Sequence, residues 1–206
     1  MKFVLLGPPA SGKDTQAEKL KKKFEIPHLS LMNMLQDEIS QKTDYGKMIK
    51  PYLERGDLEF DDLITDFILN HIDKNCSAGF ILDGFPRTIS QAEKLHEKHT
   101  IVAAILLDVP EDEIIQRITT RRFCKKCNKT YHMKINPPRA ESFCDLCGEK
   151  LSRRKEDSPK RVKKRLKAWY DDTKPIIDFY RKIGVLYRVD GRGAPEFIFN
   201  EILNIM

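Results

Sequence analysis

The chain has 206 residues, of which 40% are hydrophobic and 33% charged, with a formal net charge of +6 at pH 7. This length suits one α/β domain with small insertions and excludes a multi-domain machine, and the composition excludes a disordered chain. The charge fits either a nucleic-acid partner or a polyphosphate site. Apolar residues at helical spacing interrupt the basic runs at 19–23 and 160–167, which favours solvated helix faces over a nucleic-acid arm.

The beginning of the chain predicts a strand, a loop and a helix. Residues 2–6 form a short apolar run before Gly7, and apolar residues return at helical spacing from Ala17 to Phe24. This first run is too short for a signal peptide, and no later stretch is apolar for long enough to span a bilayer. We therefore expect a cytosolic protein without a membrane partner.

Further strand-like runs at 79–82, 101–107 and 185–189 alternate with helical stretches, which predicts a parallel sheet flanked by helices and an α/β fold. Residues 30–59 are helical in pattern without a strand, and residues 122–158 are rich in Cys, Pro and charge. We predict both as insertions at the carboxyl edge of the sheet, where open α/β sheets bind ligands. A long amphipathic helix begins at Pro159 and passes Pro175, where a bend is allowed.

A glycine-bounded loop, GPPASGK at residues 7–13, stands between the first strand and the first helix. Its backbone N–H groups and the helix N-terminus would cradle phosphates, with Lys13 reaching the β and γ phosphates. An ordinary glycine-rich turn is the alternative. Asp14 stands where Ser or Thr is usual, so it could help to hold Mg²⁺ or could repel phosphate. The ATP-binding residues predicted here are Gly7, Ala10, Ser11, Gly12, Lys13, Asp14 and Thr15.

Four of the five cysteines form two close pairs, Cys124 with Cys127 and Cys144 with Cys147. In a reducing cytosol such pairs indicate a metal rather than disulfides, and four thiolates are typical of tetrahedral Zn²⁺. We predict a structural zinc site with no open coordination position. His132 lies between the pairs and is an alternative ligand. Cys76 stands alone and is expected to be buried.

Three stretches resemble the adenylate kinases, in particular the bacterial long form with a zinc lid. They are GPPASGKDTQ at 7–16, DGFPR at 83–87 with Gln91, and CKKCNKTYHMKINPP from Cys124. The helix RLKAWYDDTKPIIDFYRKIG and the segment VDGRG extend the match over nearly the whole chain. The resemblance implies a monomer with a P-loop NTPase-type core at 1–29, 60–121 and 159–206, a nucleoside-monophosphate-binding insertion at 30–59 and a zinc-binding lid at 122–158.

The resemblance also implies roles for single residues. Asp83 would steer Mg²⁺ through its water shell, Arg87 would grip the monophosphate and Gln91 the adenine. Converging guanidinium groups would neutralise the migrating phosphoryl group, so no catalytic base is needed. The implied catalytic set is Lys13, Asp83, Arg87, Arg121, Arg154 and Arg165. ATP would also contact Arg117, Arg121 and Gly193, and AMP would contact Ser30, Leu58, Glu59, Gly84, Arg87, Gln91, Arg154 and Arg165.

One helix departs from the family pattern. Residues 30–36 read SLMNMLQ where the family usually reads STGDMLR, so Gln36 replaces an arginine. Leu31 and Met32 replace a polar and a tiny residue near the expected base position. Acceptor binding weaker by about 1–3 kcal/mol is expected if nothing compensates. The GDLE segment at 56–59 still looks like the family's base-flanking turn, which favours adenine.

The expected activity is therefore reversible phosphoryl transfer from ATP with Mg²⁺ to AMP, giving two ADP. A kinase with another acceptor monophosphate stays open, as does a nucleotide- or nucleic-acid-binding protein with impaired kinase activity. Zinc ribbons also bind nucleic acids, and this one carries Arg121, Arg122, Lys125, Lys126, Lys129 and Arg139. A lid that closes on ATP accounts for the same basic residues, so no stable nucleic-acid partner is expected.

Overall fold

The computed structural model describes residues 1–55, 61–127, 129–133, 137–153 and 157–205. The chain forms two compact units. The first comprises Met1–Gly7, Gly12–Asp108 and Asp172–Met206, and the second comprises Pro8–Ser11 and Val109–Asp171. Within the described ranges, no helix combines the length and the apolar character that crossing a membrane requires.

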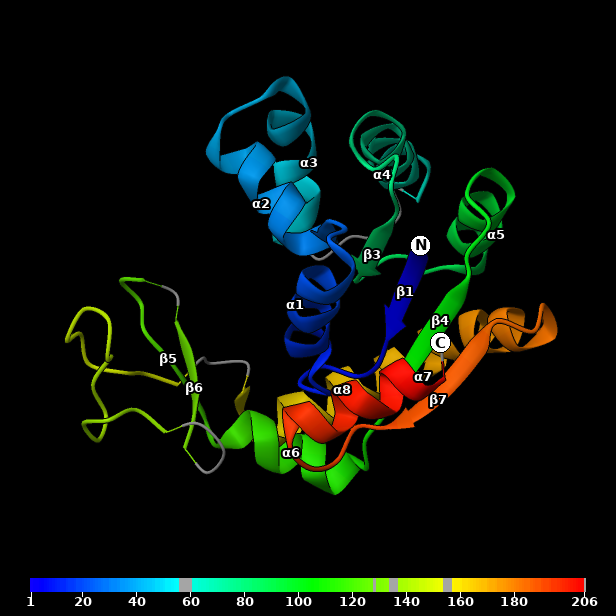
Figure 1. Cartoon of the computed structure of the whole chain (residues 1–206). Helices are drawn as coiled ribbons and strands as arrows, with labels where there is room; N and C mark the ends of the chain where they lie inside the picture. The colour runs from blue at the N-terminus through cyan, green and yellow to red at the C-terminus, as the bar shows by residue number, and fades with distance from the viewer. Residues whose placement is uncertain (56–60, 128, 134–136, 154–156, 206) are drawn as a thin grey trace. The chain divides into compact units, whose positions relative to one another are not determined.

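A five-stranded parallel sheet forms the centre of the first unit (Figure 1). Its strands are β1 (Lys2–Leu6), β2 (His28–Ser30), β3 (Phe80–Asp83), β4 (Ala103–Asp108) and β7 (Leu186–Asp190), in the spatial order β2-β3-β1-β4-β7. Leu5 of β1 lies opposite Asp83 on one side and Ile105 on the other. Ser30 lies opposite Asp83 from β2. The predicted parallel α/β sheet is confirmed, and its carboxyl edge brings together residues from separate parts of the chain.

Helices connect and cover these strands. Their bounds are α1 (Lys13–Phe24), α2 (Leu31–Ser40), α3 (Asp44–Arg55), α4 (Asp61–Asn75), α5 (Ile89–Lys98), α7 (Pro159–Lys182) and α8 (Pro195–Asn204), with α7 running from the second unit into the first. Helix α2 packs on α3, and α4 packs on α5. Lys21, Lys22 and Lys23 lie in the last turn of α1, where they complement the negative end of the helix dipole.

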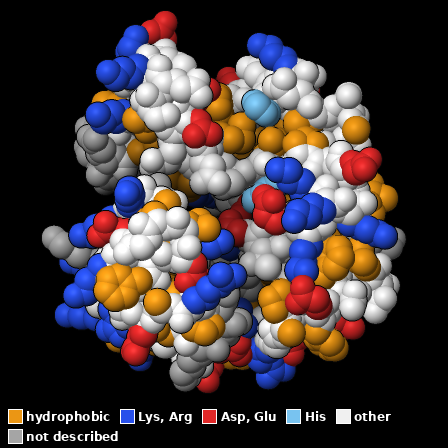
Figure 2. Space-filling model, turned by 60° about the vertical axis from the view of Figure 1, so that its left-hand side comes forward, with side chains coloured by type: hydrophobic (Ala, Val, Ile, Leu, Met, Phe, Trp, Pro, Cys, Tyr) orange, Lys and Arg blue, Asp and Glu red, His pale blue; other side chains and the backbone are white. Residues whose placement is uncertain are grey.

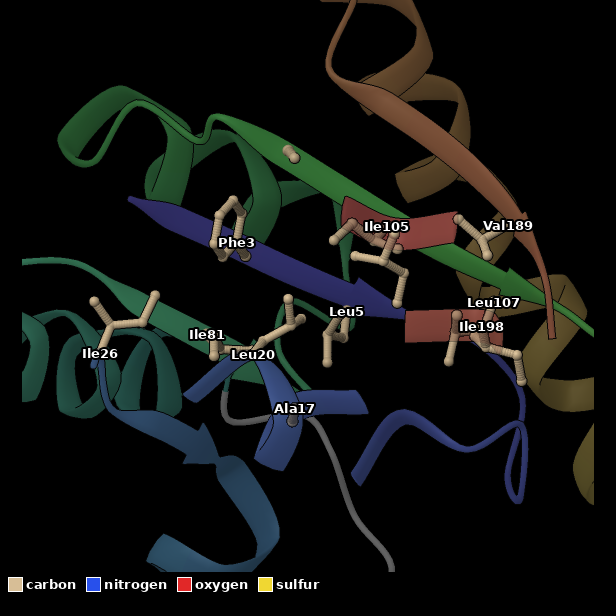
Figure 3. Packing of buried hydrophobic residues seen from close by; sticks show 12 residues of the cluster. Phe3, Leu5, Ala17, Leu20, Ile26, Ile81, Ile105, Leu107, Val189 and Ile198 are labelled. Atoms are coloured by element: carbon tan, nitrogen blue, oxygen red, sulfur yellow. The ribbon is translucent and has the colours of Figure 1, made fainter. Parts of the chain in front are cut away.

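The hydrophobic core of the first unit lies between the sheet and helices α1 and α8 (Figure 3). Phe3 and Leu5, two residues apart on β1, both point to this face, where they pack in one cluster with Leu20 of α1 and Ile198 of α8. Val4, which points to the opposite face, is also fully buried. Burial of both faces is the reason that these strands read as continuous apolar runs.

The second unit is organised around α6 (Glu111–Thr119) and the first part of α7. Ile114 and Ile118 of α6 pack with Val162 and Leu166 of α7. Each pair is spaced by four residues, so each pair lies on one face of its helix. This packing gives the second unit a core of its own.

A small antiparallel hairpin follows α6 in the chain. Strand β5 (Arg121–Phe123) pairs with β6 (Thr130–His132), and Phe123 also bridges to Ser152. Among the described residues, the hydrophobic cluster beside the hairpin has four buried members, namely Cys124, Tyr131, Cys144 and Leu151. Such a small apolar cluster agrees with a segment that needs a metal to hold it together.

Two sequence predictions differ from the structure. The stretch that begins at Ser30 is predicted to lack a strand, but Ser30 is the last residue of β2. The hairpin of β5 and β6 is not predicted either. All three strands have only three residues, which is too short for a period-2 pattern, so pairing with a neighbour decides their conformation. The helix predicted from Pro159 is confirmed, and it continues through Pro175.

The surface carries charges of both signs. On the face drawn in Figure 2, Lys and Arg side chains are interspersed with Asp, Glu and hydrophobic side chains. This distribution is typical of solvated helix faces, which the spacing of the basic runs also predicts.

Candidate functional site

Lys13 begins α1 directly after the glycine-bounded loop. Its Nζ donates a 2.8 Å hydrogen bond to the carbonyl of Gly7, so the side chain folds back along the loop. Gly12 caps the helix with a φ of 100°, a left-handed conformation that glycine adopts without steric cost. Burial lowers the pKa of Lys13, while the carboxylates of Asp83 and Asp14 act in the opposite direction. A partly buried lysine held beside the loop in this way suits a phosphate oxygen.

The turn after β3 fixes the guanidinium of Arg87. Its Nε donates to the carbonyl of Gly84 at 2.8 Å, and its backbone N–H donates to Oε1 of Gln91 at 2.7 Å. Gly84 has a φ of 79°, which again favours glycine. Burial lowers the pKa of Arg87, and the negative charge of Asp83 raises it. Local hydrogen bonds therefore hold this arginine at the carboxyl end of β3.

Asp83 ends β3, and its side chain is only 9% exposed. Burial raises its pKa to about 6; Lys13 lowers it, and Asp14 raises it further. Ligand atoms of Asp14, His28 and Asp83 all lie within 4.8 Å of one another. Two carboxylates at this separation disfavour each other's ionisation, and a cation between them relieves that repulsion. This geometry supports the alternative in which Asp14 helps to hold a metal.

Residues 8–11 of the loop belong to the second unit, where Arg117 of α6 supports them. Arg117 is 9% exposed, and its Nη1 donates to the carbonyls of Ala10 at 3.4 Å and Ser11 at 3.3 Å. Its Nη2 pairs with Glu113 one turn earlier. The hydroxyl of Ser11 is buried and, among the described residues, has no hydrogen-bond partner. Arg117 thus holds the loop through its carbonyls.

Of the other arginines predicted around the phosphates, Arg121 is bound to an acid. It donates two hydrogen bonds to Asp157, from Nε at 3.1 Å and from Nη2 at 2.6 Å. Arg165 lies exposed on α7. Arg154 lies outside the described residues. Asp157 was not identified from the sequence, because the two partners are 36 residues apart and share no spacing pattern.

The structure brings Ser30, Asp83, Gly84, Arg87 and Gln91 to one region of the first unit. Ser30 precedes α2 and lies opposite Asp83, and Gln91 is buried in the first turn of α5. Lys13 and Asp14 of the same unit lie close to Asp83. Thr15 and Gly193 are exposed, on α1 and in the loop after β7, and Leu58 and Glu59 lie outside the described residues.

His28 also belongs to this region, although it was not predicted from the sequence. This residue begins β2, and its side chain is 8% exposed. Its Nδ1 donates to Glu18 at 3.2 Å, and its Nε2 lies 4.0 Å from Oδ2 of Asp83. A prediction of β2 as a parallel strand would have indicated His28 as a candidate, because functional groups often lie at the carboxyl edge of a parallel sheet.

The four paired cysteines come together in the second unit. Sγ of Cys124 lies 3.4 Å from that of Cys147, Sγ of Cys127 lies 3.4 Å from that of Cys144, and the Cys127 and Cys147 sulfurs are 3.7 Å apart. Four sulfurs about 2.3 Å from a central Zn²⁺ would lie about 3.8 Å from one another, so the thiols fit a tetrahedral zinc ion.

Neighbouring groups orient this cluster. The hydroxyl of Tyr131 lies 3.4 Å from Sγ of Cys144 and accepts a 2.8 Å hydrogen bond from the backbone N–H of Asp145. The contact with Tyr131 lowers the pKa of Cys144 to about 6. His132 lies 3.1 Å from the hydroxyl of Thr120 and is not among the clustered ligand atoms, so the four thiols form the cluster without it. The lone Cys76 is buried, as expected.

Comparisons with known proteins agree with these motifs. A family model described as adenylate kinase matches residues 5–185. Over 100% of its length the chain is 42% identical to the adenylate kinase of Clostridium acetobutylicum, covering 99% of that relative. It is 40% identical to the adenylate kinases of Staphylococcus epidermidis and Archaeoglobus fulgidus, again over 100% of this chain and over 99% and 98% of those proteins.

Proposed function

This chain belongs to the adenylate kinase family, and we propose that its catalytic charges gather around the carboxyl ends of β1 and β3. The enzyme transfers a phosphoryl group reversibly from ATP to AMP, giving two ADP. The observation that carries the assignment of the site is that Lys13 and Arg87 are each hydrogen-bonded to a backbone carbonyl within one unit, with the carboxylate of Asp83 near both. These are the residue types that phosphoryl transfer needs at fixed positions.

Lys13 and Arg87 have different tasks in this proposal. Lys13 provides one positive charge on the transferred phosphoryl group, at the N-terminus of α1, where the helix dipole adds to it. Arg87 provides a planar pair of donors for the phosphate of AMP. Both side chains are already hydrogen-bonded to backbone carbonyls, so little reorganisation is needed before substrates bind.

Mg²⁺ is implied by the use of ATP, and oxygen ligands at the end of β3 suit it. Asp83 is buried with a raised pKa, and Asp14 lies close to it, so a divalent cation would offset the charge of both carboxylates. Bound Mg²⁺ would screen the negative oxygens of the polyphosphate. Asp83 and Asp14 would hold the cation, while Lys13 and Arg87 bind the phosphates.

The arginines of the second unit complete the proposal. We assign phosphate binding to Arg121 and Arg165, and to Arg154, which lies outside the described residues. Arg121 would exchange the carboxylate of Asp157 for phosphate oxygens when the lid closes. The exchange is possible because a carboxylate and a phosphate can each accept two hydrogen bonds from one guanidinium. Arg117 would act chiefly by supporting the loop carbonyls. Closure would also exclude water and so limit hydrolysis of ATP.

Zn²⁺ is the ion that we propose for the four-thiol cluster. The sulfur distances match a tetrahedral site, and four protein ligands leave no position for a substrate. The ion would therefore be structural. It would hold together a hairpin whose apolar cluster is too small to fold without it.

The acceptor is tested by a coupled assay with AMP, GMP, CMP, UMP and dAMP. AMP should be phosphorylated with the highest kcat/KM, with a raised KM because Gln36 carries no charge and is exposed on α2. A higher kcat/KM for another monophosphate would change the assigned acceptor. Absence of transfer to all five would favour a binding protein with an impaired kinase site.

A further inference from the structure

The close group of Asp14, His28 and Asp83 contains more than a magnesium–nucleotide complex requires. Asp14 comes from the first turn of α1, His28 from β2 and Asp83 from the end of β3, all within the first unit. Their ligand atoms lie within 4.8 Å of one another. The set offers one imidazole nitrogen and two carboxylates, which is a donor set for a divalent transition metal.

His28 is oriented as metal-binding histidines are. Its Nδ1 donates to Glu18 at 3.2 Å, which directs the lone pair of Nε2 toward the two aspartates. Nε2 is buried and has no hydrogen-bond partner among the described residues, because 4.0 Å to Oδ2 of Asp83 is too long for one. A carboxylate on the outer ring nitrogen is the usual support for a metal-bound imidazole.

The local charge also favours a cation. Among the described residues, the basic side chains recorded beside Asp83 are those of Lys13 and Arg87, against the carboxylates of Asp14, Glu18 and Asp83. With a neutral imidazole the group therefore keeps one net negative charge. A buried carboxylate and an unpaired buried nitrogen are both costly unless a partner binds them.

We propose that Asp14, His28 and Asp83 directly ligate a divalent transition metal ion of the Mn²⁺ class, in the absence of nucleotide. Neighbouring ligands of a six-coordinate ion lie about 3 Å apart when each metal bond is about 2.1 Å. Nε2 of His28 and Oδ2 of Asp83, which are 4.0 Å apart, therefore move about 1 Å closer on binding. Water molecules complete the coordination. The site goes beyond the proposed function, because it depends on a histidine and needs no ATP.

The test is a titration of the full chain with Mn²⁺, without nucleotide, after one equivalent of Zn²⁺ has been supplied to the cysteines. Thiolates prefer Zn²⁺ to Mn²⁺, so the two sites remain distinct. Electron paramagnetic resonance measures free Mn²⁺ and gives the stoichiometry and Kd. We expect one Mn²⁺ per chain. Protein containing ¹⁵N-histidine should show hyperfine coupling between the bound ion and one imidazole nitrogen.

Single substitutions locate the ion. His28→Gln and Asp14→Asn should each raise Kd at least tenfold, and His28→Gln should abolish the ¹⁵N coupling. Glu18→Gln should raise Kd about 10- to 100-fold, because it removes the support of the imidazole. His71→Gln and Asp66→Asn, which make the same changes on α4, should leave Kd unchanged.

Two results would overturn the proposal. One is that the wild-type protein does not bind Mn²⁺ at millimolar concentration in the absence of nucleotide. A proton or a nearby cationic side chain would then be the partner of Asp14, His28 and Asp83. The other is Mn²⁺ binding that persists unchanged in His28→Gln, which would assign the ion to carboxylates alone. Circular dichroism of each variant confirms that the compared proteins are folded.

Discussion

Arg121 and Asp157 form a two-point ion pair in which the carboxylate is almost entirely buried. The hydrogen bonds measure 3.1 and 2.6 Å, and the Asp157 side chain is 2% exposed while that of Arg121 is 21% exposed. The pair joins β5 to the segment that precedes α7. Because the same guanidinium is proposed to bind phosphate, Asp157 competes with the nucleotide for Arg121.

Asp157→Asn should show separately how Asp157 affects ATP binding and how it affects stability. The amide keeps the shape but removes the charge, so we expect a several-fold lower KM for ATP together with a lower melting temperature. Removal of one partner of a buried pair costs about 3–5 kcal/mol, and the partly exposed Arg121 places this case at or below the lower end. Glu149→Gln, an exposed charge removal in the same unit, serves as the control. An unchanged KM would contradict the competition.

Lys13→Met should remove most turnover while the fold is kept. Methionine fills a similar volume without the charge, and loss of one positioned electrostatic contact at a transferring group reduces kcat by about 10²–10³. Steady-state rates and melting curves measure the two effects. Lys22→Met, at an exposed position on the same helix, should retain full activity. Activity close to wild type in Lys13→Met would refute the assignment of the loop.

Cys144→Ser should release the Zn²⁺ that is proposed for the four-thiol cluster. Sγ of Cys144 lies in the four-thiol cluster, and replacing one soft ligand weakens zinc binding, so the melting temperature should fall with the metal content. Native mass spectrometry and differential scanning calorimetry measure both quantities. Cys76→Ser removes a buried thiol outside the cluster, so it should leave the metal content unchanged. Full zinc occupancy in Cys144→Ser would show that the cluster is not the site.

Gln36→Arg should strengthen binding of AMP. The substitution restores a guanidinium on α2, and a charged hydrogen bond to phosphate is worth about 1–3 kcal/mol, so KM for AMP should fall several-fold or more. Gln41→Arg makes the same chemical change at the exposed end of that helix and should leave KM unchanged. Equal effects of both variants would indicate a general electrostatic attraction instead of a specific contact.

The stability of the first unit should depend on the protonation of His99. Burial lowers the pKa of His99 below its ordinary 6.5, and Asp73 opposes this only in part. The folded state therefore prefers the neutral ring. The stability that the neutral His99 ring contributes is present above pH 6.5 and is lost as the pH falls below 6.5. His99→Gln should flatten the decrease in melting temperature between pH 7 and pH 5. An unchanged slope in His99→Gln would contradict this prediction.

Local spacing made several features predictable. The loop from Gly7 to Lys13 and the cysteine pairs are contiguous in the chain, so their chemistry follows from the sequence order alone. The long apolar runs of the central strands are equally local. The strands predicted at 79–82, 101–107 and 185–189 lie within two residues of β3, β4 and β7. The short strand β2 was not predicted, because its conformation depends on pairing with the neighbouring strand β3.

By itself the sequence determined the α/β class, the phosphate loop, the thiol pairs and the membership of a kinase family. Only the tertiary structure decided that His28 faces Asp14 and Asp83, and that Arg121 binds Asp157. The physical reason is distance along the chain. A spacing rule covers a few helical turns or one strand, whereas parallel strand pairing and helix packing bring together residues tens of positions apart.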